Sequence, residues 1–225
     1  MNSQTTFTEN SKGWIRLLGA IVFVIVVAGI FAYLIGDRST SQSKPKADPV
    51  IAFDTFNHSS ANGSLGRINK NYQWASVSGQ WTIDGGVGHS LASSSGSSFA
   101  VVEIGNDASV SALTTGRGSC GLVAVFSDLS NFVSLQRDDR EANWKIIVIR
   151  DGKPETIGSV GGIAADNNRI SLLVDPPVVT AVSGGNHSSF VVENLPTGTQ
   201  AGLFTTGPAS TLCTFDDVTF VTPSQ

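Results

Sequence analysis

The apolar residues of this chain follow two different patterns, one on each side of residue 50. Residues 17–35 form a run of nineteen residues without a charge. At the rise of an α-helix this run is about 29 Å long, close to the roughly 30 Å of a bilayer core. From Val50 onward, short segments alternate apolar and polar residues, and Gly, Asn, Asp or Pro regularly interrupts them. Such alternation predicts an all-β antiparallel sandwich.

These two patterns divide the chain into four predicted segments. Residues 1–13 are a short cytoplasmic tail, 14–36 one transmembrane α-helix, 37–49 a flexible linker and 50–222 the sandwich domain. The alternative for the apolar run is a cleaved signal peptide. Signal peptides have a shorter apolar core and end at a cleavage site of small residues, and this chain offers no clear site of that kind. Trp14 and Tyr33 lie near the ends of the predicted helix, where aromatic rings favour the headgroup region. The run therefore predicts a retained single-pass anchor.

Two details of the anchor have more than one interpretation. Lys and Arg flank the run almost evenly, so the positive-inside rule does not orient it. Ala28, Ala32 and Gly36 recur every four residues, and such a stripe of small residues would let two helices approach closely. Small residues are also simply common in membrane helices. A helix dimer through this stripe is therefore one interpretation of two, and we favour the simpler one.

Several strands can be placed from the pattern alone. Residues 99–105, 121–127 and 131–138 each predict a strand. A hairpin is predicted to turn at Asp151-Gly152, a pair that tolerates the positive φ of tight turns. A second hairpin is predicted to turn at Asp175-Pro176-Pro177, and because proline donates no ladder hydrogen bond, we expect this turn at a sheet edge.

The charge of the sandwich segment narrows the range of partners. The whole chain carries a formal charge of -4, but from Ala47 onward nine Lys and Arg face sixteen Asp and Glu. This part therefore has a net charge of -7. A negative domain repels phosphate backbones, so we predict that nucleic acid is not a partner.

The order of several segments resembles a known family. The series "FDTFN", "YQWASVSGQWTIDGG", "CGLVAVFSDLSNFVSLQRDD", "WKIIVIRDGK", "NNRISLLVD", "TGTQAGLFT" and "FDDVTFV" is similar to concanavalin A-like, LamG-like jelly-roll domains over about residues 51–222. The resemblance implies two antiparallel sheets, one of them concave, with the first and last strands adjacent. It also implies that Trp74 and Trp81 lie in the core. The chain departs from the pattern at Pro176-Pro177, where many relatives have a glycine turn.

Cys120 and Cys213 are the two cysteines of the chain. Outside the cytosol a disulfide is the economical prediction, and two buried free thiols are the alternative. A bridge would close a long loop and stabilise the fold by roughly 4 to 5 kcal/mol in the chain-entropy estimate. A disulfide would also orient the anchor, with the N-terminus in the cytoplasm and the C-terminal domain outside it.

The acidic pair Asp216-Asp217 sits inside the last predicted strand. Phe215 and Val218 cannot both face inward in a regular strand, because their separation is odd, so a bulge is predicted at the acidic pair. Related jelly rolls often hold a structural calcium near their terminal strands, and Asp54 on the first strand would supply a third carboxylate. Calcium prefers six to eight oxygen ligands, so the alternative, that these acids are simply solvated, is favoured.

No catalytic pattern stands out in the chain. It has neither a G-x-S-x-G nucleophile elbow nor the Glu-x-Asp-x-x-Glu strand of the jelly-roll glycosidases, and its three histidines lie in polar loops. We therefore predict that the protein is not an enzyme.

A binding role is the remaining prediction. Glycan sites offer an apolar platform with a few polar groups, for which Tyr72 and Trp144 are the candidates, with hydrogen bonds from Asn143 or Asp139. The alternative is that Trp144 belongs to the core. We expect a membrane-anchored extracytoplasmic binding module for carbohydrate or another envelope component. The second hypothesis is a structural or accessory subunit of a membrane or surface assembly.

Overall fold

The alternating segments fold into strands throughout the part of the chain that the structure describes. In this computed structural model, the described residues are 50–60, 63–91, 96–106, 109–116, 118–138, 140–162, 168–207 and 213–222. The predicted tail, transmembrane helix and linker lie outside them, as does the stripe of Ala28, Ala32 and Gly36. Within the described ranges, no helix has the length and apolar character needed to cross a membrane.

Fifteen strands are present in the described residues. They are β1 (Val50–Asp54), β2 (Ala75–Ser78), β3 (Gln80–Asp84), β4 (Val87–Leu91), β5 (Ser97–Glu103), β6 (Ser109–Thr115), β7 (Ser119–Asp128), β8 (Asn131–Asp138), β9 (Asn143–Arg150), β10 (Lys153–Gly161), β11 (Asn168–Asp175), β12 (Val178–Ser183), β13 (Asn186–Val191), β14 (Gln200–Thr206) and β15 (Thr214–Val221). β7 and β8 cover the predicted strands 121–127 and 131–138, and β5 covers the predicted strand 99–105 up to Glu103, so all three strands are confirmed.

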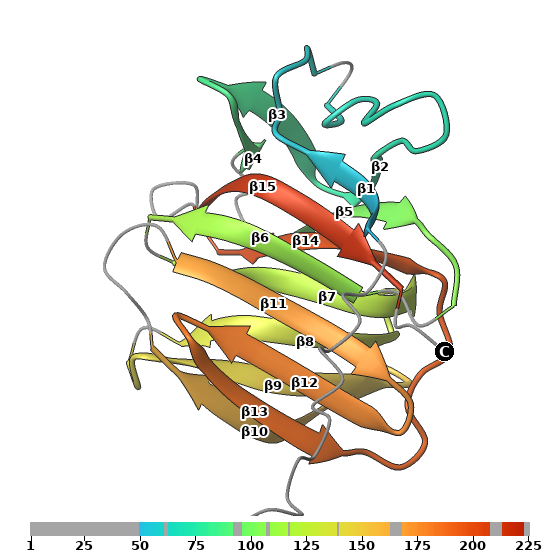
Figure 1. The fold of residues 1–225 in the computed structure, drawn as a ribbon, viewed down its shortest axis with the longest axis vertical. Coiled ribbons are helices and arrows are strands. Elements are labelled where there is room, and N and C mark those ends of the chain that lie inside the picture. The colour runs from blue at the N-terminus through green and yellow to red at the C-terminus, as the bar shows by residue number, and fades with distance from the viewer. Residues whose placement is uncertain are drawn as a thin grey trace, which may run out of the picture. The chain divides into compact units, whose positions relative to one another are not determined.

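The strands form two antiparallel sheets packed face to face (Figure 1). One sheet has eight strands, in the order β13-β12-β11-β6-β15-β4-β3, with β1 paired to β15 as well. The other has seven, in the order β10-β9-β8-β7-β14-β5-β2. All neighbouring strands are antiparallel, as the alternating pattern predicted.

The first and last strands pair, as the resemblance implied. In β1, Asp54 lies opposite Val218 of β15. The register between β15 and β6 shifts after Asp216, and Asp217 has a φ of 48°. This bulge lets Phe215 and Val218 both enter the core. The predicted bulge at the acidic pair is therefore confirmed.

Both predicted hairpins form, but one lies elsewhere than expected. Asp151 and Gly152 join β9 to β10 with positive φ at both residues, the geometry of a tight hairpin turn. Pro176-Pro177 joins β11 to β12 through a cis peptide bond. The expected edge position is wrong, because β13 pairs with the outer side of β12. Both prolines sit in the turn, where the ladder needs no N–H donor.

The core fills the space between the sheets. Three tryptophans, Trp74, Trp81 and Trp144, are its largest fully buried side chains. Burial of Trp74 and Trp81 confirms the core role implied by the resemblance. Large aromatic rings contribute much of the energy of a sandwich core, because each removes a large apolar area from water.

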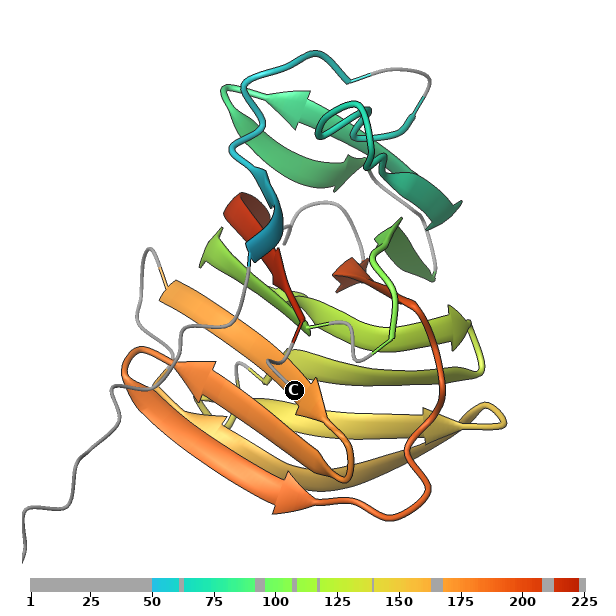
Figure 2. The same cartoon turned by 45° about the vertical axis from the view of Figure 1, so that its right-hand side comes forward.

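One open side of the sandwich is closed by a close contact between the two edge strands β10 and β13, which meet at the bottom of Figure 2. The ring of Phe190 in β13 occupies the place that a Cβ would take at Gly158 in β10. A Cβ at this position would therefore displace the ring of Phe190 from the contact between the two edge strands.

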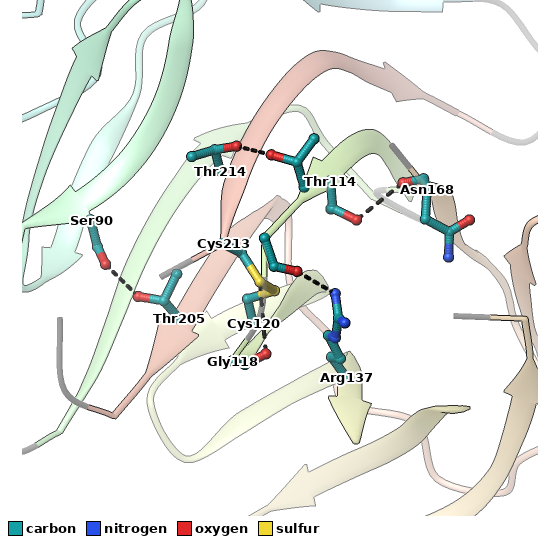
Figure 3. Close-up of a disulfide and its surroundings, with 11 residues drawn as sticks. Ser90, Thr114, Gly118, Cys120, Arg137, Asn168, Thr205, Cys213 and Thr214 are labelled. Carbon is teal, nitrogen blue, oxygen red and sulfur yellow. Dashed lines mark hydrogen bonds between the residues drawn. A yellow bond between two sulfur atoms is a disulfide. The ribbon is translucent and has the colours of Figure 1, made fainter. Parts of the chain in front are cut away.

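A disulfide joins the two sheets. Figure 3 shows the bridge between Cys120 in β7 of the seven-stranded sheet and Cys213, which directly precedes β15 of the eight-stranded sheet. The Cα atoms are 6.1 Å apart, within the range of a native disulfide. Beside it, the hydroxyls of Ser90 and Thr205 form a second link between the sheets at 2.6 Å. The predicted bridge is confirmed, and it indicates an extracytoplasmic domain.

Candidate functional site

Trp144, the predicted stacking platform, lies in the core. Its exposed fraction is 0%, and it is buried together with Ile146 and Val148 of the same strand. These three residues alternate along β9 and therefore share its inward face. Trp144 offers no surface to a ligand. The structure therefore supports the alternative interpretation, in which Trp144 belongs to the core.

The other predicted platform residues do not converge on Trp144. Tyr72 precedes β2, and β2 is five strands from β9 in the sheet, about 24 Å at the usual strand spacing. The ring of Tyr72 packs partly buried against the core. Asn143 is half-buried and donates from Nδ2 to Glu141 Oε2 at 3.2 Å. Asp139 lies outside the described residues.

The β8–β9 turn beside Asn143 is occupied by an ion-pair cluster. Lys145 Nζ lies 2.6 Å from Asp138 Oδ2 and 3.2 Å from Glu141 Oε1. The hydrogen bond from Lys145, followed by that from the backbone N–H of Arg140, lowers the pKa of Asp138. The hydrogen bonds to Asp138 and then Glu141 raise the pKa of Lys145. The charges of Asp138, Glu141 and Lys145 are therefore engaged with one another.

The three acids predicted to hold calcium do not share a site. Asp54 is only 3% exposed, and its carboxylate accepts from Phe56 N at 2.8 Å and Trp74 Nε1 at 2.7 Å. His58 Nε2 lies 3.0 Å from the same carboxylate. Asp54 thus organises a buried hydrogen-bond network instead of facing an ion.

The acidic pair of β15 is also engaged within the protein. Asp216 Oδ1 accepts from Asp217 N at 2.7 Å, and Asp217 Oδ2 lies 3.3 Å from Arg169 Nη2. Among the residues that the structure describes, no group of three or more His, Cys, Asp or Glu is placed to hold a metal ion. The predicted calcium ligands therefore do not come together in this fold.

A hollow of about 790 Å³ lies at one end of the sandwich. It is formed by the β11–β12 turn, the bulge of β7 and the connection between β13 and β14, with Asn106 at its margin. The lining residues are Asn106, Val125, Phe126, Ser127, Pro176, Pro177, Val192, Glu193, Asn194, Leu195, Pro196, Thr197, Gly198, Thr199 and Gln200. We call it the end hollow.

The floor of the end hollow is a stretch of β7 with irregular backbone geometry. Val125 has a φ of 44°, and the register of β7 shifts against both β8 and β14 at this point. Positive φ is a genuine outlier for a β-branched residue, and such strain often marks a functional segment. Gly198 lies directly over this stretch, where a Cβ would collide with the backbone of Val125 and Phe126.

The wall formed by residues 192–199 is held from three sides. Arg150 donates from Nε to Asn194 O and from Nη2 to Glu193 O, each at 2.9 Å, and its Nη1 lies 2.6 Å from Glu155 Oε2. Val192 N donates to Pro177 O at 2.8 Å. Ile104 N donates to Thr199 O at 3.0 Å. These bonds preorganise the wall, which lowers the ordering cost of binding.

A second hollow of about 490 Å³ adjoins the first. Phe126, Ser127 and Gln200 line both. Val77 of β2 and the β7–β8 turn, which includes Leu129, complete its lining. We call this the side hollow.

The middle of the outer face of the seven-stranded sheet is filled by its own aromatic side chains. Phe99 and Val101 alternate with the core residues Ala100 and Val102, so they point away from the core. Phe99 packs against three other phenylalanines, with ring centroids 5.4 to 5.8 Å apart. All four rings are buried, and one of them, Phe126, contributes to the lining of both hollows.

The two hollows combine apolar groups with uncharged polar groups. Hydroxyls and amides come from residues such as Ser127, Thr197 and Gln200, and apolar surface comes from Leu195 and the prolines. Such mixed lining suits a small organic ligand with hydroxyl groups. Sequence reasoning missed these residues because the lining comes from separate loops. The closest signal is the Pro, Thr and Gly content of residues 195–199.

Comparison with known proteins gives a fold but no sequence family. No protein-family profile matches the chain, and no curated protein matches it in sequence. Among solved structures, the carbohydrate-binding module CBM66 from Bacillus subtilis is similar with a TM-score of 0.57 and 18% identity, over 66% of this chain and 95% of that one.

Two further structures have comparable similarity. A protein of unknown function with a galectin-like fold from Bacillus subtilis has a TM-score of 0.55 and 12% identity, over 79% of this chain and 99% of that one. A β-glucanase from Bacillus licheniformis has a TM-score of 0.50 and 9% identity, over 80% of this chain and 100% of that one. The chain therefore has a concanavalin A-like, galectin-like jelly-roll β-sandwich.

Proposed function

We propose that this protein is a membrane-anchored extracytoplasmic binding module that recognises carbohydrate, or another hydroxyl-rich component of the cell envelope, in the end hollow. The observation that carries the proposal is the preorganised wall of residues 192–199, which is held by Arg150 and presents hydroxyl and amide groups beside apolar side chains. The disulfide supports an extracytoplasmic position, and the apolar run of residues 17–35 supports a single-pass anchor with the N-terminus in the cytoplasm.

The module acts by binding and not by catalysis. One structural neighbour is a β-glucanase by name, so hydrolysis is the natural competing proposal. Glycoside hydrolysis needs two carboxyl groups on either side of the scissile bond. Glu193 is the single acidic residue among the described residues that line the end hollow. This lining favours recognition.

A binding screen with a blocking variant tests the proposal. The full-length chain in nanodiscs is applied to a broad glycan array, alongside Thr197→Trp, which fills the end hollow from its exposed wall. Thr156→Trp is the matched control, since Thr156 is exposed on β10 and lines neither hollow. We expect reproducible binding by the wild type and the control, and loss of binding in Thr197→Trp. Equal binding by all three proteins would refute the site.

The second candidate function is an accessory subunit of a membrane or surface assembly. Val50 and Phe53 on β1 are exposed large apolar residues, and β1 directly follows the predicted linker. Exposed apolar residues close to a membrane anchor would suit contact with a neighbouring protein. An array without binding, together with a partner that co-purifies with the wild type but not with Phe53→Ser, would favour this function instead.

A further inference from the structure

The end hollow and the side hollow lie in series along one end of the sandwich. They meet at Phe126, Ser127 and Gln200, which contribute to both linings. Each hollow falls within the size range of a small-molecule site, at about 790 and 490 Å³. A ligand that fills the first and continues past Ser127 enters the second.

The side hollow is lined in part by apolar side chains that are exposed to solvent and lie outside the core. Val77 is 41% exposed and Leu129 is 51% exposed, and both line this hollow. Two large aliphatic side chains that face solvent across one concavity are a suitable surface for the C–H face of a sugar ring. Ser127 and Gln200 line both hollows. The Ser127 hydroxyl donates to Asn131 O at 3.3 Å, so it can accept a hydrogen bond from a ligand hydroxyl, and the Gln200 amide can donate and accept.

The turn that carries Leu129 is held rigid by its own polar groups. Asp128 Oδ1 accepts from Ser130 N at 2.7 Å and from Asn131 Nδ2 at 3.2 Å. Gly152 N donates to Ser130 O at 2.9 Å, which ties this turn to the β9–β10 turn. The carboxylate of Asp128 is therefore engaged in the turn, and Leu129 is presented at a defined position.

The charge of the lining selects the class of ligand. Among the described residues that line the two hollows, none is Lys or Arg, and the acids are Glu193 and Asp128. Arg150, which holds the wall of the end hollow, is itself paired with Glu155 at 2.6 Å. Anionic ligands would therefore meet a surface with excess negative charge, which lowers their affinity. An uncharged ligand pays no such cost.

We propose that the two hollows are consecutive subsites for an uncharged polysaccharide chain, so that the protein binds stretches of several sugar units. This inference rests on the proposed function, because it assumes that the end hollow binds a glycan. The end hollow holds one part of the chain by hydrogen bonds, and the side hollow holds the next part against Val77 and Leu129.

Length-dependent affinity tests the proposal. The full-length chain in nanodiscs is titrated calorimetrically with uncharged gluco- and manno-oligosaccharides of about one to eight units, and with uronic-acid oligosaccharides of matched length. We expect the affinity to rise at least about tenfold from the shortest binder to the chains that span both hollows, because extra apolar surface is buried. The uronic-acid series should bind more weakly.

Two variants separate the subsites. Leu129→Ser should remove the gain in affinity with ligand length, whereas Thr197→Trp should abolish binding at every length. Val191→Ser, at an exposed valine that lines neither of the two hollows, is the control. Binding that does not change with length, an unaltered gain in Leu129→Ser, or preference for the uronic-acid series would overturn this inference alone. No binding at any length, together with a glycan array without binding, would overturn the proposed function as well.

Discussion

The buried carboxylate of Asp54 should be a major source of stability, and Asp54→Ala is the perturbation that measures it. In the wild type this group accepts hydrogen bonds from Trp74 Nε1 and Phe56 N, at 2.7 and 2.8 Å. Both donors belong to fully buried residues. The substitution leaves two buried N–H groups unpaired, at about 1–3 kcal/mol each. His58 adds little, since its side chain is 28% exposed and remains hydrated.

We therefore expect Asp54→Ala to lower the free energy of unfolding by about 4 kcal/mol, and the melting temperature by roughly 8–16 °C for a domain of this size. Circular dichroism of the full-length chain in detergent, during urea and thermal unfolding, measures this loss. Trp74→Phe removes one donor, so the double variant should lose about 1.5–3 kcal/mol less than the two single losses together. His58→Ala should cost less than about 1 kcal/mol. A loss below about 1 kcal/mol in Asp54→Ala, or simple additivity, would refute the network.

Three further predictions concern other contacts. Reducing the disulfide, which spans 93 residues, should lower the free energy of unfolding by about 4.6 kcal/mol and the urea midpoint by about 2 M. Coincident unfolding curves with and without reductant would contradict this prediction. Gly158→Ala should cost about 1–3 kcal/mol because its Cβ collides with Phe190, whereas Gly161→Ala, with open space around it, should cost less in the same unfolding assay. Lys145→Met should raise the pKa of Asp138 toward its ordinary value in an NMR titration. In the wild type, the lowered pKa of Asp138 stabilises the fold at pH values above the ordinary aspartate pKa, and this stabilisation is lost as the pH falls through the pKa of Asp138 in the folded state. An unchanged titration of Asp138 in the variant would show that Lys145 does not lower its pKa.

The sandwich and several of its details could be predicted from the residues in sequence. The hairpin at Asp151-Gly152 follows from local backbone preferences, and the bulge at Asp216-Asp217 follows from the parity of the apolar positions around it. Both arguments use only neighbours in the chain, so no knowledge of packing is needed. The pairing of Cys120 with Cys213 was predictable because the chain holds no third cysteine.

The candidate site could not be predicted in the same way. Trp144 has the composition of a sugar platform, but its same-face companions in β9 carry it into the core. Asp54 and the acidic pair of β15 lie on paired strands. Their carboxylates nevertheless have separate partners within the protein, Trp74 for Asp54 and Arg169 for Asp217. Side-chain type shows what a residue is able to do, and its partners decide what it does.

Sequence alone therefore determined the all-β class, the two hairpin turns, the bulge and the disulfide, because each depends on local periodicity, on backbone preference or on a unique pair of residues. The anchor stays a prediction, since residues 17–35 lie outside the described residues. Tertiary structure alone decided which face each aromatic ring occupies, which carboxylates are engaged, and where the chain leaves concave surface. The side hollow is lined by residues as distant in sequence as Val77 and Gln200, which the strand order β14-β5-β2 brings to one concavity. No local pattern encodes such a meeting, because it depends on the order of strands in the sheets and on the loops that join them.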